Sequence, residues 1–231
     1  MCLLKTKPVI TIDGPAGAGK TTVSQRIANV YKYIWVDTGA LYRGVALISK
    51  QKNIDVNDDT KLNQLCHSLH LHFVRKENQL KLYNHDLDIS QDIRMPEISL
   101  LASKISALPL VRQYLLDVQR QFAKQGGAVF EGRDMGTVVF PDADIKFFLN
   151  ADHAIRAKRR YQECQAKGIK TNLETMSKDM KQRDMQDQNR KIAPLTPASD
   201  AIHIDCSQMD IDQVVKQMCE EIDKRIKGQY T

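Results

Sequence analysis

The 231-residue chain is 42% hydrophobic and 27% charged, values typical of a globular protein that buries a substantial core. No apolar run approaches the roughly 20 residues of a membrane span, and the first residues lack the hydrophobic stretch of a signal peptide, so we expect neither a membrane protein nor a secreted one. The net charge of +6 suits a nucleic acid, an acidic membrane or a phosphate ligand, and the positions of the arginines decide among them.

The five cysteines are scattered, odd in number and free of any C-x-x-C pair. This pattern indicates reduced thiols and argues against a disulfide framework or a zinc site. We therefore expect a cytoplasmic protein.

A nucleotide-binding motif follows the first predicted strand. Gly14, Gly19, Lys20 and Thr21 fill the fixed places of G-x-x-x-x-G-K-[ST]. The glycines let several backbone N–H groups point at one phosphate, and the next helix begins with a partial positive charge. In this motif the lysine reaches the β- and γ-phosphates and the hydroxyl holds Mg²⁺. The predicted ATP-binding residues are Gly14, Pro15, Ala16, Gly17, Ala18, Gly19, Lys20, Thr21 and Thr22.

The first helix is predicted over residues 21–31. Val23, Ile27 and Val30 share one face of it, so we expect them in the core. A short apolar strand over residues 34–36 follows.

The second helix is predicted to begin at Thr38, which can cap it. Arg43 would then lie near its start, beside the carboxyl end of a strand, where open α/β sheets bind ligands. The alternative is that Tyr42 packs and Arg43 is solvated. The predicted buried stripe of this helix is Leu41, Val45 and Ile48.

A β-hairpin interrupts the alternation of helices and strands. Residues 69–73 and 80–83 alternate with period two, and residues 76–79 between them form the predicted turn. Such a hairpin indicates an inserted lobe outside the parallel core. His70 and His72 share one face of the hairpin, but no metal-ligand spacing supports them, so we expect solvated or hydrogen-bonded rings.

Charged residues follow the next buried strand. Helices are predicted over 96–107 and from Pro109 onward, and a strand over 128–130. Residues 131–136, Glu-Gly-Arg-Asp-Met-Gly, come directly after it, which again places charges at the ligand edge of the sheet. A mere surface turn would explain the glycines but not these charges.

Two arginine-bearing helices are predicted over 152–167 and 173–190, after a strand over 145–149 and before the last strand at 201–204. They have little core of their own, as in a mobile arm. Surface ion pairing, as between Asp187 and Arg183, is the alternative. The residues predicted to share a face are Arg156, Arg159 and Arg160 on the first helix, and Arg183, Asp187 and Arg190 on the second.

These arginines indicate a second anion besides ATP, because guanidinium groups bind phosphates in a bidentate manner. ATP together with a phosphorylated acceptor makes a phosphotransferase. The N-K-x-D and D-x-x-G patterns of switch GTPases are absent. A nucleic-acid-binding P-loop protein is the alternative from another class, but aromatic residues are only 6% and do not alternate with the basic ones, so we expect no nucleic-acid partner.

The chain resembles the bacterial cytidylate kinase family in four segments, residues 10–20, 37–43, 132–143 and 183–195. The Gly-Arg-Asp-Met-Gly-Thr stretch in the third segment is more specific than the P-loop. The resemblance implies the α/β fold of P-loop nucleoside monophosphate kinases. That fold has a five-stranded parallel sheet with helices on both faces, an inserted small β/α acceptor-binding lobe and a helical lid.

The resemblance implies a monomeric kinase that transfers the γ-phosphate of ATP to CMP or dCMP, giving CDP or dCDP and ADP. The same chemistry on UMP, AMP or shikimate is the near alternative. Residues 1–231 would form one domain with a core of 8–60, 109–152 and 192–231, an NMP-binding insert of about 61–108 and a lid of about 153–191.

The resemblance also assigns roles to residues. CMP would be bound by Thr38, Tyr42, Arg43, Ser103, Arg112, Arg133, Asp134, Arg183 and Asp187. Its phosphate would meet Arg43, Arg112 and Arg133, and its cytosine or sugar would meet Ser103, Arg183 and Asp187. The catalytic set would be Lys20, Arg133, Asp134, Arg159, Arg160 and Arg190.

Mg²⁺ would be held by Thr21 and, through a water, by Glu131, where similar enzymes often have the shorter Asp. Phosphoryl transfer needs alignment and charge neutralisation more than covalent help. We therefore expect no obligatory general base, and Asp134 would hydrogen-bond the acceptor.

Overall fold

The computed structural model describes residues 7–76, 79–124, 126–166 and 168–228. The predictions that fall on the N-terminal residues 1–6, on turn residues 77–78 and on the helix end at Lys167 lie outside these ranges. The chain divides into two compact units. The first contains the residues up to Trp35 and from Gln125 onward, and the second is Val36–Lys124.

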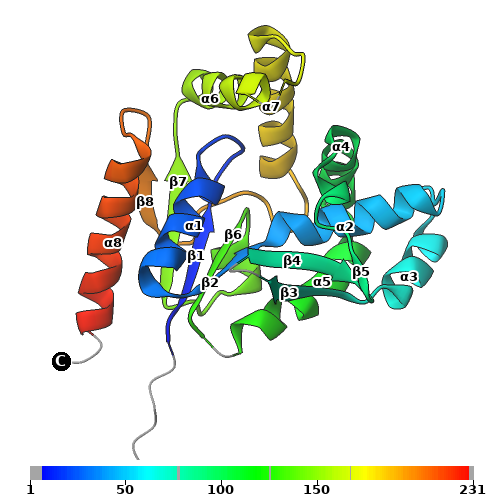
Figure 1. The fold of residues 1–231 in the computed structure, drawn as a ribbon, viewed down its shortest axis with the longest axis horizontal. Coiled ribbons are helices and arrows are strands. Elements are labelled where there is room, and N and C mark those ends of the chain that lie inside the picture. The colour runs from blue at the N-terminus through cyan, green and yellow to red at the C-terminus, as the bar shows by residue number, and fades with distance from the viewer. Residues whose placement is uncertain (1–6, 77–78, 125, 167, 229–231) are drawn as a thin grey trace, which may run out of the picture. The chain divides into compact units, whose positions relative to one another are not determined.

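A parallel sheet runs through the first unit in the order β2-β6-β1-β7-β8 (Figure 1). This confirms the predicted α/β class with a five-stranded parallel sheet. At β2 the chain passes from the first unit to the second. The strands are β1 (Val9–Asp13), β2 (Ile34–Asp37), β6 (Ala128–Gly132), β7 (Ile145–Asn150) and β8 (Ile202–Asp205).

The core of the first unit lies between the sheet and two helices, α1 (Lys20–Tyr31) and α8 (Ile211–Gly228). The predicted core positions Val23 and Ile27 are fully buried, but Val30 is 59% exposed, so that prediction was wrong. The face toward the core instead advances by four residues from Ile27 to the partly buried Tyr31. The Tyr31 hydroxyl donates to the Asp223 carboxylate of α8 at 2.8 Å.

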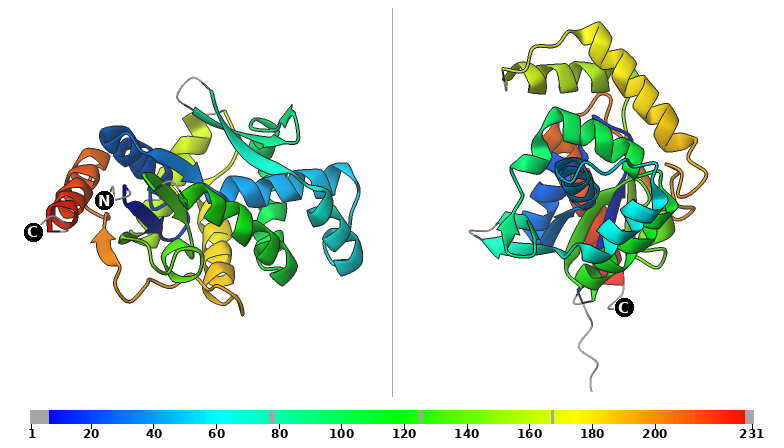
Figure 2. Two further views of the ribbon diagram at one scale, coloured as in Figure 1. Left: turned by 90° about the horizontal axis from the view of Figure 1, so that it is seen from below. Right: turned by 90° about the vertical axis from the view of Figure 1, so that its right-hand side faces the viewer.

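Two further helices of the first unit, α6 (His153–Ala166) and α7 (Leu173–Gln188), pack against each other. The loop between them ends at Asn172, whose side chain caps α7 by accepting from the Thr175 N–H at 2.7 Å. Figure 2 shows the pair joined at one end. α7 is polar along most of its length, with Met180, Asp184 and Asp187 as its buried residues.

The second unit is built on α2 (Thr38–Gln51). The predicted stripe of Leu41, Val45 and Ile48 is buried, which confirms it. The hairpin is also confirmed as antiparallel, and a third short strand extends it. The other elements are α3 (Asp59–Ser68), β3 (Leu71–Lys76), β4 (Gln79–Asn84), β5 (Leu87–Asp88), the 3₁₀ turn η1 (Asp92–Arg94), α4 (Pro96–Ile105) and α5 (Pro109–Ala123).

The cap of α2 differs from the prediction. Asp37, not Thr38, is the cap, and its Oδ1 accepts from the Ala40 N–H at 3.2 Å. The carboxylate reaches the N–H three residues ahead, as a capping side chain does, while Thr38 has already entered the first turn of the helix. None of the described helices has both the length and the apolarity to cross a membrane. The domain boundaries expected from the sequence remain a prediction.

Candidate functional site

The loop between β1 and α1 depends on its glycines. Gly14 has a φ of +147°, and a Cβ there would lie 2.0 Å from the Leu149 carbonyl oxygen of β7. Gly17 has a φ of +74°, and a Cβ there would lie 2.7 Å from the Met180 side chain. Both positions exclude larger residues, so the backbone fixes the curve that a phosphate-binding loop requires.

Lys20 begins α1 with its side chain curled back over this loop. Its ammonium donates to the carbonyl oxygens of Gly14 and Pro15 at 2.7 Å each. Burial lowers the pKa of Lys20 well below its ordinary value, and the charge of Arg133 lowers it further, against the opposing charge of Glu131. An incoming phosphate would counter this penalty, since an anion favours the charged ammonium.

Asp13 joins the loop to the segment after β6. Strands β1 and β6 end together, with Asp13 opposite Gly132. The Asp13 carboxylate accepts from the N–H groups of Met135 at 2.9 Å and Gly136 at 2.8 Å, at the start of the π-helical turn η2 (Met135–Val139). Burial raises the pKa of Asp13 to about 6, although these two hydrogen bonds lower it. The strand end that precedes the phosphate-binding loop is therefore tied to the segment after β6, one of the two that the sequence predicts at the ligand edge of the sheet.

Arg133 reaches α7 from the same segment. Its Nε donates to Asp187 Oδ2 at 2.9 Å, and both side chains are mostly buried. Burial alone would raise the pKa of Asp187, but the charges of Arg133, Arg183 and Arg190 outweigh it and hold this pKa below its ordinary value. The structure thus brings Arg133, Arg183 and Arg190 close enough to Asp187 for their charges to act on its carboxylate. It buries Asp134 beside them.

The predicted basic face of α6 is wrong in one respect. Arg156 is buried and forms an ion pair with Asp184 of α7 at 2.6 Å, because its guanidinium turns inward to meet a buried carboxylate. Arg159 instead donates to the carbonyl oxygens of Cys206 at 2.8 Å and Met209 at 3.2 Å, in the segment after β8.

Arg160 lies on the surface of α6. It pairs with Glu163, three residues along the same helix, at 2.8 Å, and both side chains are about half exposed. Among the described residues, neither Arg159 nor Arg160 makes a hydrogen bond or ion pair with Lys20 or Arg133, so the structure does not bring these two predicted catalytic residues to that group.

The second unit gathers its own predicted residues. The Arg112 guanidinium lies over the Tyr42 ring, 5.6 Å from its centroid, and donates to the Ser106 carbonyl oxygen at 3.0 Å. Nearby in the chain, the Ser103 hydroxyl is buried, and among the described residues it has no hydrogen-bond partner. Thr38 is almost fully buried.

Arg43 is held by the same aspartate that caps α2. Its Nη2 donates to Asp37 Oδ2 at 2.5 Å, while Oδ1 of that carboxylate makes the cap. The carboxylate that caps the helix therefore also fixes the guanidinium of Arg43. Arg43 is not the solvated surface side chain of the alternative prediction.

A profile of the cytidylate kinase family matches residues 10–224. The chain belongs to the cytidylate kinase family. This confirms the family predicted from the four sequence segments. Relatives include the cytidylate kinase of Syntrophotalea carbinolica, 46% identical over 94% of this chain and 92% of that protein, and cytidylate kinase 1 of Haemophilus influenzae, 42% identical over 90% of each.

A solved structure shares the fold of this cytidylate kinase family member. It is that of an uncharacterised protein from Eubacterium ventriosum, with a TM-score of 0.51 and 14% identity, covering 94% of this chain and 99% of that one. At that identity the likeness bears on the fold alone.

The loop offers oxygen ligands of the kind that Mg²⁺ prefers. Thr21 is exposed at the start of α1, and the carboxylates of Asp13 and Glu131 lie buried at the ends of neighbouring strands. No cluster of three or more His, Cys, Asp or Glu side chains suited to a metal occurs in the described part of the chain. Mg²⁺ with few protein ligands, completed by substrate phosphates, fits this donor set.

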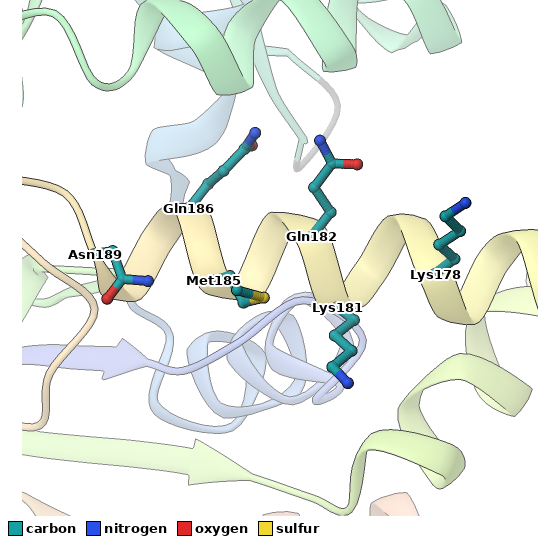
Figure 3. A pocket seen from close by; sticks show the side chains of 6 residues that line it. All are labelled: Lys178, Lys181, Gln182, Met185, Gln186 and Asn189. Atoms are coloured by element: carbon teal, nitrogen blue, oxygen red, sulfur yellow. The ribbon is translucent and has the colours of Figure 1, made fainter.

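A hollow lies along α7, the helix that also carries Arg183 and Asp187. Figure 3 shows Gln182 and Gln186 pointing to one side of the helix and Lys181 to the other. None of the predicted ATP- or CMP-binding residues lines it. Its lining residues are Lys178, Lys181, Gln182, Met185, Gln186 and Asn189.

Sequence reasoning missed three residues that organise this cytidylate kinase fold, Asp13, Arg156 and Asp184. Asp13 carried a signal, because it is a charged residue at the end of a buried strand, directly before the first glycine of the motif. The sequence signal at Asp184 and Arg156 was ambiguous, because helical spacing alone does not show whether a charged side chain turns inward.

Proposed function

We propose that this chain transfers the γ-phosphate of ATP to CMP or dCMP, giving CDP or dCDP and ADP. The observation that supports this most strongly is membership of the cytidylate kinase family over residues 10–224, including an intact phosphate-binding loop. The alternative acceptors UMP, AMP and shikimate are not favoured, because the relatives are cytidylate kinases over nearly the whole chain.

The ATP phosphates bind the loop from Gly14 to Thr22. The positive φ angles of Gly14, Gly17 and Gly19 support this assignment, because they turn successive N–H groups inward. Lys20 supplies a positive charge to the β- and γ-phosphates. On binding ATP, the Lys20 ammonium would exchange its hydrogen bonds to the carbonyl oxygens of the loop for hydrogen bonds to phosphate oxygens.

Mg²⁺ accompanies the ATP. Thr21 is its proposed direct ligand, and Glu131 is proposed to act through a water. The bound ion neutralises charge on the phosphate oxygens during transfer. Glu131 is also placed to steady Lys20, since its charge favours the ammonium form.

CMP binding is assigned to two groups of residues. In the second unit, Arg43 and Arg112 bind the CMP phosphate, and Ser103 meets the base or sugar. The buried Ser103 hydroxyl supports this, because an unpartnered polar group in the interior is costly unless a ligand satisfies it. The remaining residues assigned to CMP are Thr38, Tyr42, Arg133, Asp134, Arg183 and Asp187.

Transfer itself requires alignment of the CMP phosphate oxygen with the γ-phosphorus and neutralisation of the spreading charge. Lys20 and Arg133 are proposed for the second task, with Arg190. Arg159 and Arg160 are assigned to it as well, and their guanidiniums would have to leave Cys206 and Glu163 to take part. No general base is required, and Asp134 hydrogen-bonds the acceptor.

The wider assignments complete the proposal. The protein acts as a cytoplasmic monomer on ATP and CMP or dCMP, without nucleic acid. Residues 61–108 form the NMP-binding insert and residues 153–191 the lid, within one kinase domain whose core comprises 8–60, 109–152 and 192–231.

ADP release with CMP, dCMP, UMP and AMP in turn tests the activity. CMP and dCMP should be turned over at least about tenfold better than the others by kcat/KM, and equal turnover of AMP would refute the CMP assignment.

Asp134→Asn tests the role of that carboxylate. A large loss of kcat with unchanged affinity for both nucleotides would point to a base instead of a binding role.

A further inference from the structure

Ala16, in the middle of the phosphate-binding loop, is held by side chains from both α6 and α7. Its N–H donates to Asp184 Oδ1 at 3.4 Å, and its carbonyl oxygen accepts from Arg156 Nη1 at 2.9 Å. Both backbone groups of one loop residue are therefore engaged by a single ion pair. Asp184 comes from α7 and Arg156 from α6.

The ion pair is almost completely buried. Arg156 and Asp184 are each only 7% exposed, and Arg156 Nη1 lies 2.6 Å from Asp184 Oδ2. The Nε of Arg156 also donates to the carbonyl oxygen of Ala151, the residue directly after β7, at 2.8 Å. The guanidinium is thus fixed at its stem and at its tip.

The next loop residue is wedged against the same two helices. A Cβ on Gly17 would lie 3.0 Å from the Arg156 carbonyl oxygen and 2.7 Å from the Met180 terminal methyl. Any side chain at position 17 would therefore press against α6 and α7, and Ala16 is hydrogen-bonded to both helices. The position of the loop and that of the two helices depend on each other.

A gain in folding stability does not explain the buried ion pair of Arg156 and Asp184. Burying two charges costs several kcal/mol each, and well-packed apolar residues of similar volume often serve stability as well or better. The geometry instead suits the fixing of a backbone segment in one place, for which fork-shaped guanidinium and carboxylate groups are well adapted.

We propose that Arg156 and Asp184 are positioning residues that hold the loop at Ala16 and Gly17 in the conformation that binds the ATP phosphates. Neither side chain touches the nucleotide. They act by fixing the loop backbone and by coupling it to the helix that carries Arg183 and Asp187. The inference rests on the proposed binding of ATP by this loop.

The test is the double substitution Arg156→Met with Asp184→Leu, which removes both charges and fills the space. Unfolding temperature and the Kd for MgATP, measured by calorimetry without CMP, are compared with wild type. We expect an unfolding temperature within a few degrees of wild type and a Kd raised about tenfold or more. A Kd within twofold of wild type in a folded double variant would overturn the proposal.

A second variant covers the case in which the double variant does not fold. Asp184→Asn keeps the shape and one acceptor but loses the charge, and it should raise the Kd for MgATP at least fivefold at a temperature where it is folded. A change of less than twofold would again overturn the proposal. The matched control is Asp179→Asn, an exposed carboxylate on the same helix, which should leave the Kd unchanged.

ATP binding is measured alone, so the result does not depend on which acceptor is phosphorylated. Failure of the wild-type protein to bind MgATP would refute the proposed function itself. Normal binding by wild type together with normal binding by the double variant would refute only the positioning role.

Discussion

The phosphate-binding loop of the first unit and the end of α4 in the second unit hold their polar groups in opposite ways. Around the loop, Lys20 bonds to carbonyl oxygens, and Ala16 is bound through both its N–H and its C=O. At the end of α4 the Ser103 hydroxyl is buried, and within the described residues no group hydrogen-bonds to it.

The contrast separates two ways of preparing to bind a nucleotide. A loop whose backbone is fixed by its own protein keeps its curvature and the direction of its remaining N–H groups without further reorganisation, which favours electrostatic stabilisation. A buried hydroxyl without a partner favours a ligand that supplies one, which favours selection among ligands. Substitutions in the first region should therefore affect phosphate handling, and those in the second should affect acceptor affinity.

The largest effect is expected for Lys20→Ala in the loop. Removing this cation should lower kcat/KM by about 10²- to 10³-fold, as for the loss of one transition-state donor. The unfolding temperature should fall little, because the substitution also removes a desolvated charge. Steady-state kinetics and thermal melting test this together. Retention of more than a tenth of wild-type kcat/KM would contradict the role of Lys20.

Arg112→Lys in the second unit comes next. Lysine keeps the charge but loses the bidentate fork and the stacking over Tyr42, so the KM for CMP should rise roughly 10- to 100-fold. The KM for ATP should change less than twofold. A change in the KM for CMP alone would distinguish the second unit from the phosphate-binding loop. Arg120→Lys, on the exposed side of the same helix, serves as control. Equal changes in both KM values would erase the distinction between the regions.

Asp13 gives a pH dependence specific to the first region. Its pKa is about 6 in the folded protein against an ordinary value of 3.8, so the folded state holds more protons between these values. Stability should therefore fall as pH rises from about 4 to 6, by at most about 1.4 kcal/mol per pH unit from this group. Carbon-13 NMR of the carboxyl groups tests the assignment directly.

The control for Asp13 is present in the same spectrum. Hydrogen bonds from Ser90 lower the pKa of Asp88 to about 2, in the hairpin of the second unit. Asp88 should therefore titrate well below Asp13. A midpoint for Asp13 below pH 4 would show that its burial does not penalise the charge.

Ser103→Ala should have the smallest effect. The KM for CMP is expected to rise about threefold to tenfold, because one neutral hydrogen bond contributes about 1 kcal/mol. Stability should be unchanged or slightly higher, since an unpartnered buried hydroxyl is removed. Ser49→Ala, whose buried hydroxyl donates to the Val45 carbonyl oxygen at 2.8 Å, is the comparison for stability. A marked loss of stability in Ser103→Ala would show that this hydroxyl has a structural partner.

The sequence predicted the features that depend on local pattern. Apolar periodicity found the five strands of the parallel sheet and most helices but not the short strand β5. Gly14, Gly19 and Lys20 identified the loop, because its function lies in the backbone. The α2 stripe and the hairpin were found for the same reason. Val30 was wrongly placed because the last turn of a helix can leave the buried stripe.

The partners of charged side chains were much less predictable. Arg156 and Asp184 lie on different helices, and nothing in their spacing indicates that they meet at Ala16. Thr38 was predicted as the cap of α2, but Asp37 fills that place, and either residue type can do so. Contacts that join segments distant in the chain depend on the folded arrangement, which a single sequence does not reveal.

The neighbours of β1 have a consequence for how the chain folds. This strand carries the phosphate-binding loop, yet Val9 pairs with Ala128 and Ile10 with Ile145, both far along the chain. During synthesis, the side chains of Ile10 and Ile12 cannot be buried between neighbouring strands until β6 and β7 have been synthesised. The second unit lies wholly between β1 and those strands, so it is complete first. The loop thus takes shape late, and pairings of such long sequence separation make this step slow and prone to aggregation.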